Sequence, residues 1–248
     1  MQGTWTGPRA PAPAPAREER IPAADGAATV RLARCLSRHL AELESPERRR
    51  LVVMCIGTDR STGDALGPLV GSLLIEQGLC EGGAPGGAAA WAPPLQRVAV
   101  YGTLDRPVHA ANLEEVLSRA TRGGEHSLVL AVDACLGRLD NVGSIAVGRG
   151  PLRPGAGVNK NLTQVGDLYI TGTVNVGGFM EYLVLQNTRL NLVVSMARVI
   201  AAGVLLALEA GNAAVDEGPR TAPLVGGVRL AAACRASAPP VVEAVDPA

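Results

Sequence analysis

Two kinds of hydrophobic pattern alternate along the chain. Short and nearly continuous apolar runs, such as residues 51–56 and 127–132, are typical of parallel strands that are covered on both faces. Between the runs, apolar residues recur at three- and four-residue spacing, as in helices with one buried face. The pattern predicts strands at 51–56, 97–101, 127–132, 143–147 and 167–171, and helices at 27–43, 65–79, 111–120, 179–185 and 190–209. This alternation predicts an α/β fold, a three-layer α/β/α domain with a mostly parallel sheet.

The two ends of the chain differ from its middle. Residues 1–25 are rich in proline and alanine, and we expect a disordered tail because such a segment buries little apolar surface. Residues 26–211 form the predicted single domain, and residues 212–248 are expected to be a mostly irregular tail. The Gly/Ala-rich stretch 81–94 is interpreted as a surface loop inserted into this domain.

Composition narrows the possible partners. The 248 residues carry 23 basic and 23 acidic side chains, and this balance argues against a protein that holds nucleic acid by phosphate charge. Residues 190–210 are apolar enough to raise the question of a membrane helix, but Arg198 lies near their middle, where a charge costs about 2.5–3.5 kcal/mol. The five cysteines include no CxxC pair and fit a reducing compartment. We therefore expect a cytoplasmic protein with neither a nucleic-acid nor a membrane partner.

Polar residues interrupt the pattern at the turn "GTDRSTGDALG", which follows the first predicted strand. Asp59 and Asp64 lie in this turn, and Asp133 follows the third predicted strand. In an open parallel sheet, binding sites form beyond the carboxyl ends of the strands. Two carboxylates in one crevice can hydrolyse a bond through an activated water, since one holds a proton while the other accepts one. They are equally a beginning of an oxygen-ligand metal site.

Each of these residues also has a purely structural interpretation. Asp64 stands where a helix N-cap is expected, and Asp133 can hydrogen-bond its own turn. Asp59 is typical of turns. Arg60 and Arg138 can bind a substrate anion or simply be solvated.

The remaining motifs exclude several enzyme classes. The sequence contains no HExxH, GxSxG, Walker or GxGxxG signature. His109 lies in a loop that opens a helix, where capping or packing is its more common role.

Four segments carry a resemblance to a known family. They are "CIGTDRSTGDALGPLVG", "YGTLDRPVHAANLEE", "VDACLGRLDNVGSIAVGRGPLRPGAGVNK" and "TGTVNVGGFMEYLVLQNTRLNLVVSMA". Together, and in this order, they closely resemble the YyaC family of sporulation proteins over residues 51–210. More remotely, the family is similar to the germination protease of spore-forming bacteria and to hydrogenase-maturation endopeptidases.

The resemblance implies a phosphorylase/hydrolase-like, germination-protease-like fold and a function. The Asp-Ala-Leu-Gly-Pro segment of the germination protease is matched from Asp64 onward, and its Ile-Asp-Ala segment is matched at Asp133. By this similarity, the chain is expected to be a sporulation-associated, peptidase-like hydrolase that uses these two aspartates on a protein or peptide substrate. The hydrogenase-maturation enzymes add a histidine and hold a metal, but no histidine follows Asp133 here, so we predict neither a metal nor another cofactor.

The other residues of the matched segments are expected to form the substrate-binding wall. They are Thr58, Asp59, Arg60, Ser61, Thr62, Gly63, Arg138 and Asn159. The alternative is a non-catalytic sporulation factor that keeps the same fold as a peptide-binding or regulatory module.

Overall fold

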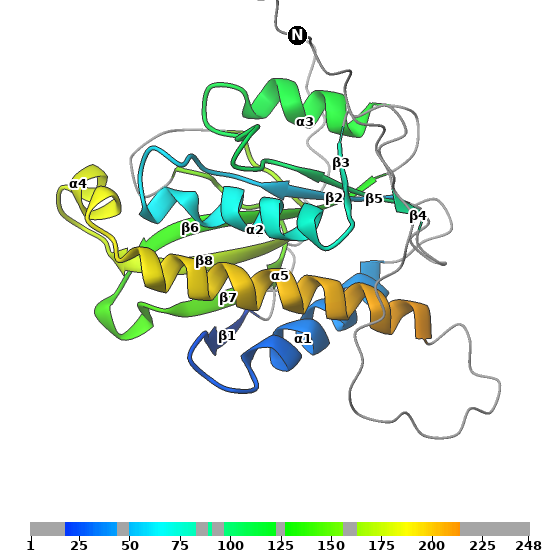
Figure 1. The fold of residues 1–248 in the computed structure, drawn as a ribbon, viewed down its shortest axis with the longest axis horizontal. Coiled ribbons are helices and arrows are strands. Elements are labelled where there is room, and N and C mark those ends of the chain that lie inside the picture. The colour runs from blue at the N-terminus through cyan, green and yellow to red at the C-terminus, as the bar shows by residue number, and fades with distance from the viewer. Residues whose placement is uncertain are drawn as a thin grey trace, which may run out of the picture. The chain divides into compact units, whose positions relative to one another are not determined.

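A mixed β-sheet with helices on both faces forms the centre of the molecule (Figure 1). The computed structural model describes residues 18–43, 50–82, 89–90, 97–122, 127–155 and 163–213. The strands are β1 (Glu19–Pro22), β2 (Arg50–Cys55), β3 (Cys80–Glu81), β4 (Ala89–Ala90), β5 (Arg97–Tyr101), β6 (Ser127–Gly137), β7 (Ser144–Arg149) and β8 (Leu168–Val176). The α-helices are α1 (Ala28–Leu43), α2 (Leu66–Glu76), α3 (Leu113–Thr121), α4 (Glu181–Gln186) and α5 (Leu190–Ala213), with 3₁₀ turns η1 (Gly63–Ala65) and η2 (Leu139–Asn141).

The strand order confirms the α/β fold and corrects the description of the sheet. The order is β1-β7-β8-β6-β2-β5-β3, and β4 pairs with β5. Strands β8, β6, β2, β5 and β3 pair in parallel, whereas β7 is antiparallel to both β8 and β1. The sheet is therefore mixed. The cause is local: only residues 138–143 connect β6 to β7, too few for the crossover that a parallel pairing requires.

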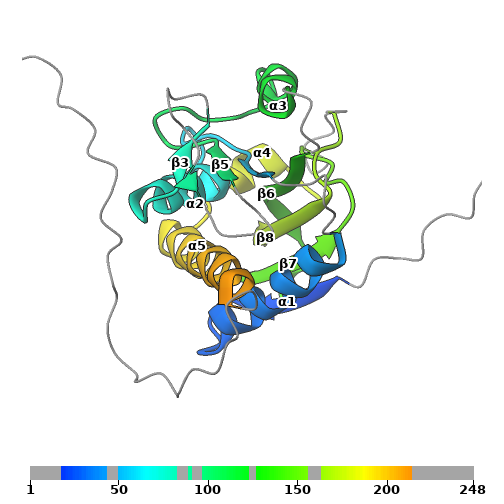
Figure 2. The ribbon, with the colours of Figure 1, turned by 90° about the vertical axis from the view of Figure 1, so that its right-hand side faces the viewer.

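Apolar residues on both faces of the central strands explain their continuous hydrophobic runs. In β2, Leu51 and Val53 belong to the larger core, which lies under α1, α2 and α5. The alternate residues Val52 and Met54 belong to a second core under α3. Figure 2 shows α3 on the opposite side of the sheet from α5. The helices therefore cover the sheet from both sides, as the sequence predicted.

Helix α5 accounts for the longest apolar stretch in the sequence. Within the described residues, Leu190–Ala210 is the one helical segment long and apolar enough to cross a membrane. In the structure this helix packs against α1 and α2, and Val193, Met196 and Ile200 are fully buried. Its apolar face is part of the larger core.

The predicted disordered tail is wrong for its last residues. Strand β1 pairs with β7 in the register Ile21 to Ile145, and the Ile21 side chain is fully buried. Asp25 then accepts a hydrogen bond from Ala27 N (2.9 Å) and pairs with Arg31 (3.0 Å), which orders the start of α1. One buried apolar residue is enough to hold this polar segment in place, because β7 supplies hydrogen-bond partners for its backbone. Residues 1–17 and 214–248 lie outside the described part of the chain, so the predictions for them stay predictions.

The inserted segment 81–94 is partly described. Glu81 belongs to β3, and Ala89–Ala90 form β4 against β5. These short pairings replace part of the predicted loop, while residues 83–88 and 91–96 lie outside the described residues.

Candidate functional site

The first candidate carboxylate, Asp133, lies inside a strand rather than after one. Strand β6 was expected to end at Val132, but it continues to Gly137 because β8 pairs with it along this length, with Asp133 opposite Thr171. Strand β2 ends earlier, at the pair of Cys55 with Val132. Beyond that point, no strand in the described part of the chain pairs with the side of β6 that faced β2. Asp133 therefore stands at the carboxyl edge of two adjacent parallel strands, as the sequence predicted.

The second candidate carboxylate, Asp64, comes from the turn between β2 and α2. The amide of Thr58 donates a hydrogen bond to the carbonyl oxygen of Asp64 (3.1 Å), which closes the turn. Gly57 makes this closure possible: its φ is 142°, and a Cβ there would lie 2.0 Å from the Asp64 carbonyl oxygen. Helix α2 is capped at Ala65, so Asp64 is not its N-cap residue. The turn places Asp64 one residue earlier, in η1.

Asp64 and Asp133 line the same cavity. Its volume is about 180 Å³. The polar lining residues besides the two aspartates are Cys135, Arg153 and Thr171. The other lining residues are Ala134, Leu136, Leu152, Gly155 and Leu185. This geometry agrees with the expectation from the sequence, in which the first and third predicted strands bring the two carboxylates into one crevice.

The two carboxylates have unequal environments. Asp64 is half-buried, whereas the Asp133 residue is only 7% exposed. Burial, and then the negative charge of Asp64, raise the pKa of Asp133 well above its ordinary value. A hydrogen bond of 2.8 Å from Ala134 N to Asp133 Oδ1 acts in the opposite direction. The net effect favours a protonated Asp133 beside a charged Asp64.

Cys135 is a polar residue of the cavity that the sequence analysis missed as a site residue. It follows Asp133 by two positions in a strand, and this period-2 spacing was the available signal. Its Sγ lies 3.5 Å from Thr173 Oγ1. Burial raises the pKa of the Cys135 thiol, against the opposing hydrogen bonds of Thr173 and Thr171. Because the thiolate is the nucleophilic form, this thiol is poorly suited to attack a substrate.

Arg153 is the second residue that sequence reasoning missed. It lies at the rim of the cavity and is exposed. With the Gln164 amide turned so that its oxygen faces Arg153, that oxygen accepts hydrogen bonds from Nε (3.1 Å) and Nη2 (3.3 Å). Arg153 comes from a Gly/Pro-rich loop without hydrophobic periodicity, so no pattern pointed to it.

Residues 58–63, the predicted substrate-binding turn, are not among the residues that line the cavity. Asp59 and Arg60 are exposed, and the Arg60 amide donates to Thr58 Oγ1 (3.4 Å). Gly63 packs against Leu185, a cavity residue: a Cβ on Gly63 would lie 2.8 Å from its Cδ2. The remaining turn residues, Ser61 and Thr62, are half-buried and do not line the cavity either.

Two predicted residues come from other segments. The Arg138 side chain is 85% exposed, with Nη2 4.0 Å from Asp140 Oδ2, and it does not line the cavity. Asn159 lies outside the described residues. A substrate-binding role for these residues stays a prediction.

The structure assigns His109 a local role. Its backbone amide donates to Asn112 Oδ1 (2.8 Å), and its Nδ1 accepts from the Ala111 amide (3.3 Å). These bonds order the start of α3, in keeping with the capping interpretation. In the described part of the chain, no three His, Cys, Asp or Glu side chains gather as a metal site would require.

Comparison with known proteins finds relatives along most of the chain. The family described as "Protein of unknown function (DUF1256)" matches residues 20–81 and 90–203. The chain is also 50% identical over 182 residues to "Uncharacterized protein YyaC" of Bacillus subtilis (strain 168), an alignment that covers 73% of this chain and 80% of the relative. The family match begins at residue 20 and so includes most of β1 and all of α1. Both elements lie before the segments that carried the resemblance in the sequence.

Proposed function

The chain belongs to the YyaC-like DUF1256 family, and we propose that it is a peptidase-like hydrolase that acts through Asp64 and Asp133 on a protein or peptide substrate. We propose further that it acts during sporulation, in the cytoplasm of the sporulating cell or in the spore interior. The proposal includes a phosphorylase/hydrolase-like, germination-protease-like version of the α/β fold.

The observation that carries the proposal is the unequal pair of carboxylates in one cavity. Asp133 is buried, with a raised pKa, and Asp64 is half-buried and raises that pKa further by its charge. Paired acids whose environments push their pKa values apart are the usual basis for assigning a general acid and a general base. Asp133 is thus the acid, and Asp64 is the base.

The proposed reaction is attack of water on a peptide carbonyl. Asp64 accepts a proton from the water while the water oxygen forms a bond to the carbonyl carbon. Asp133 donates a hydrogen bond to the carbonyl oxygen. Arg153, at the cavity rim, stabilises the negative charge that develops on that oxygen. When the C–N bond breaks, the proton held by Asp64 passes to the leaving nitrogen.

An apolar surface beside the cavity supports a polypeptide substrate. Phe179 is 79% exposed and Tyr182 is 66% exposed, and Met180 and Leu183 are exposed next to them. These residues belong to α4 and to the segment that leads into it, and α4 contacts η1, which carries Asp64. Leu185 of α4 also lines the cavity. A contiguous exposed apolar patch, unlike single exposed apolar side chains, is typical of an interaction site.

Cleavage of unfolded polypeptides tests the proposal. The parent protein is incubated with acid-soluble proteins extracted from spores and with casein, and the products are identified by mass spectrometry. We expect Asp64→Asn and Asp133→Asn each to lose activity by about 100-fold or more, because general acid–base catalysis contributes on that order. Asp140→Asn is the matched control, since this carboxylate is 84% exposed and outside the cavity, and Cys135→Ala should also retain activity.

The outcomes separate the hydrolase from the non-catalytic alternative. A parent protein that binds these polypeptides without cutting them would be a peptide-binding module. An Asp64→Asn variant with full activity would remove Asp64 from the mechanism, because asparagine cannot act as a base.

A further inference from the structure

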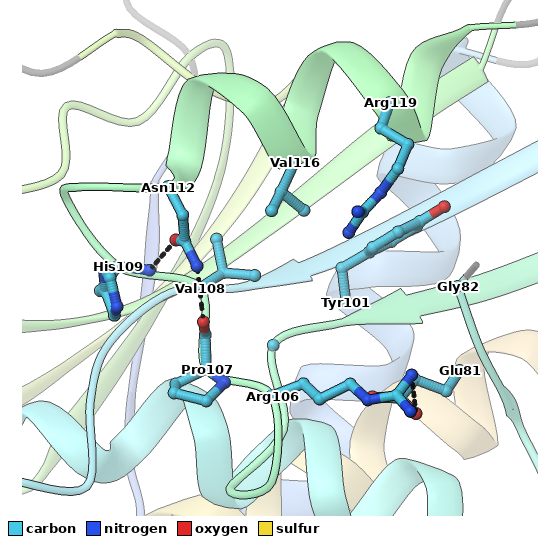
Figure 3. A pocket seen from close by; sticks show the side chains of 11 residues that line it. Glu81, Gly82, Tyr101, Arg106, Pro107, Val108, His109, Asn112, Val116 and Arg119 are labelled. Atoms are coloured by element: carbon cyan, nitrogen blue, oxygen red, sulfur yellow. Dashed lines mark hydrogen bonds and ion pairs between the residues drawn. The ribbon is translucent and has the colours of Figure 1, made fainter. Parts of the chain in front are cut away.

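A second and larger cavity lies at the α3 side of the sheet (Figure 3). Its volume is about 540 Å³. It lies between the end of β5, the loop that leads from β5 to α3 and ends at Asn112, the face of α3 that carries Val116 and Arg119, and the end of β3. Among the described residues, it shares no lining residue with the cavity of Asp64 and Asp133. A function for it is therefore independent of the proposed hydrolase.

An aromatic side chain forms one wall of this cavity. Tyr101 is 5% exposed and sits at the carboxyl end of β5. Its ring packs against the backbone of Gly82, where a Cβ would lie 2.1 Å from the ring carbon Cζ. Val108 and Val116 add buried apolar surface. These side chains give the cavity an apolar inner wall, with the planar Tyr101 ring along one side.

A cation without a protein partner stands over this wall. Figure 3 shows Arg119 reaching from α3 toward Tyr101. Within the described residues, Arg119 makes no hydrogen bond or ion pair. The other arginine of the cavity, Arg106, lies 3.4 Å from Glu81, and Glu81 also accepts a hydrogen bond from Thr103 Oγ1 (3.3 Å). The acid of the cavity is therefore already engaged, and Arg119 is the cation available to a ligand.

His109 supplies a donor at the other end of the cavity. Its Nδ1 accepts a hydrogen bond from the Ala111 amide. A neutral imidazole with an accepting Nδ1 carries its proton on Nε2, which can therefore donate. The Asn112 amide is occupied on both sides, by His109 N and by Pro107 O. Among the described lining residues, the side chains of Arg119 and His109 are thus left as hydrogen-bond donors.

We propose that this cavity binds a small organic anion, with a carboxylate or phosphate group held by Arg119 and a flat apolar body against Tyr101. Guanidinium groups favour these planar or tetrahedral oxyanions, with which they form paired hydrogen bonds. The volume lies within the range of small-molecule sites. The site lies beyond the carboxyl end of a parallel strand, where open α/β sheets bind their ligands.

Binding of three related probes to the full chain tests the proposal. Phenyl phosphate and benzoate share a flat apolar body and differ in the anionic group, and benzamide is their neutral counterpart. Isothermal titration calorimetry should detect saturable binding of at least one of the two anions, weaker binding at high salt, and at least about tenfold weaker binding of benzamide. Comparison of the two anions tells a phosphate site from a carboxylate site.

Two arginine variants locate the binding. Arg119→Gln should weaken binding of the anion about tenfold or more, because it removes a charged hydrogen-bond donor. Arg122→Gln, three residues further along the chain and outside the cavity lining, should leave binding unchanged. Both side chains are exposed, so neither change is expected to unfold the protein. Equal binding by both variants, equal binding of benzamide, or no saturable binding of either anion would overturn the proposal.

Discussion

Strand β1 is predicted to contribute substantially to stability through a single side chain. Ile21 is fully buried in the larger core, although it stands in a polar, proline-rich segment. Ile21→Ala removes three carbon atoms. At about 0.8 kcal/mol for each buried methylene, the transfer contribution is about 2.4 kcal/mol. The cavity left behind adds to this, so the expected loss lies between about 2 and 5 kcal/mol.

Urea unfolding followed by circular dichroism measures this loss. The matched control is Val30→Ala, which changes an apolar residue of neighbouring α1 that is 48% exposed and should cost less than about 0.5 kcal/mol. A loss below about 0.5 kcal/mol for Ile21→Ala would refute the reasoning, because it would mean that β1 is not docked on β7 in solution. A variant that lacks only residues 1–17 keeps β1 and is a third sample for the same urea unfolding comparison.

Two further predictions concern the site. Because the pKa of Asp133 is raised on folding, the stability that protonated Asp133 contributes is complete below the unfolded pKa of about 3.9 and is lost as the pH rises through the folded pKa. Urea unfolding from pH 4 upward should therefore show Asp133→Asn gaining stability relative to the parent. A difference in stability that does not change with pH would contradict the raised pKa. Gly57→Ala should cost about 1–3 kcal/mol or more in thermal or urea unfolding, since its φ is 142° and a Cβ would meet the Asp64 carbonyl oxygen, whereas Gly26→Ala, with nothing within 4 Å, should be nearly neutral; equal effects would show that the turn closes differently.

The central part of the fold was predictable because burial on both faces leaves a clear trace in the sequence. The runs that became β2, β5 and β6 are almost wholly apolar, and the structure pairs them side by side. The helical spacing of apolar residues that predicted α5 was equally clear. Rules of sheet topology then placed Asp64 and Asp133 at one edge, and the family resemblance singled them out among the acidic residues.

Other features left no such trace. Strand β6 continues past Asp133 because β8 supplies partners, and hydrogen bonding between backbones does not depend on an apolar side chain. Strand β1 is specified by one buried isoleucine, and the antiparallel β7 by the shortness of its connection. Arg153 reaches the cavity from an irregular loop, whose path no periodic pattern encodes. The peptidase activity and the sporulation role stay proposals.

The central claim is that Asp64 and Asp133 act as one unit in one cavity. Its most direct test is the carboxyl ¹³C titration of Asp133 by NMR in the parent and in Asp64→Asn. Because the charge of Asp64 raises the pKa of Asp133, the account predicts a lower pKa of Asp133 in the variant, still above its ordinary value owing to burial. An Asp133 pKa that is the same in both proteins would show that the two carboxylates do not interact, and would contradict the account.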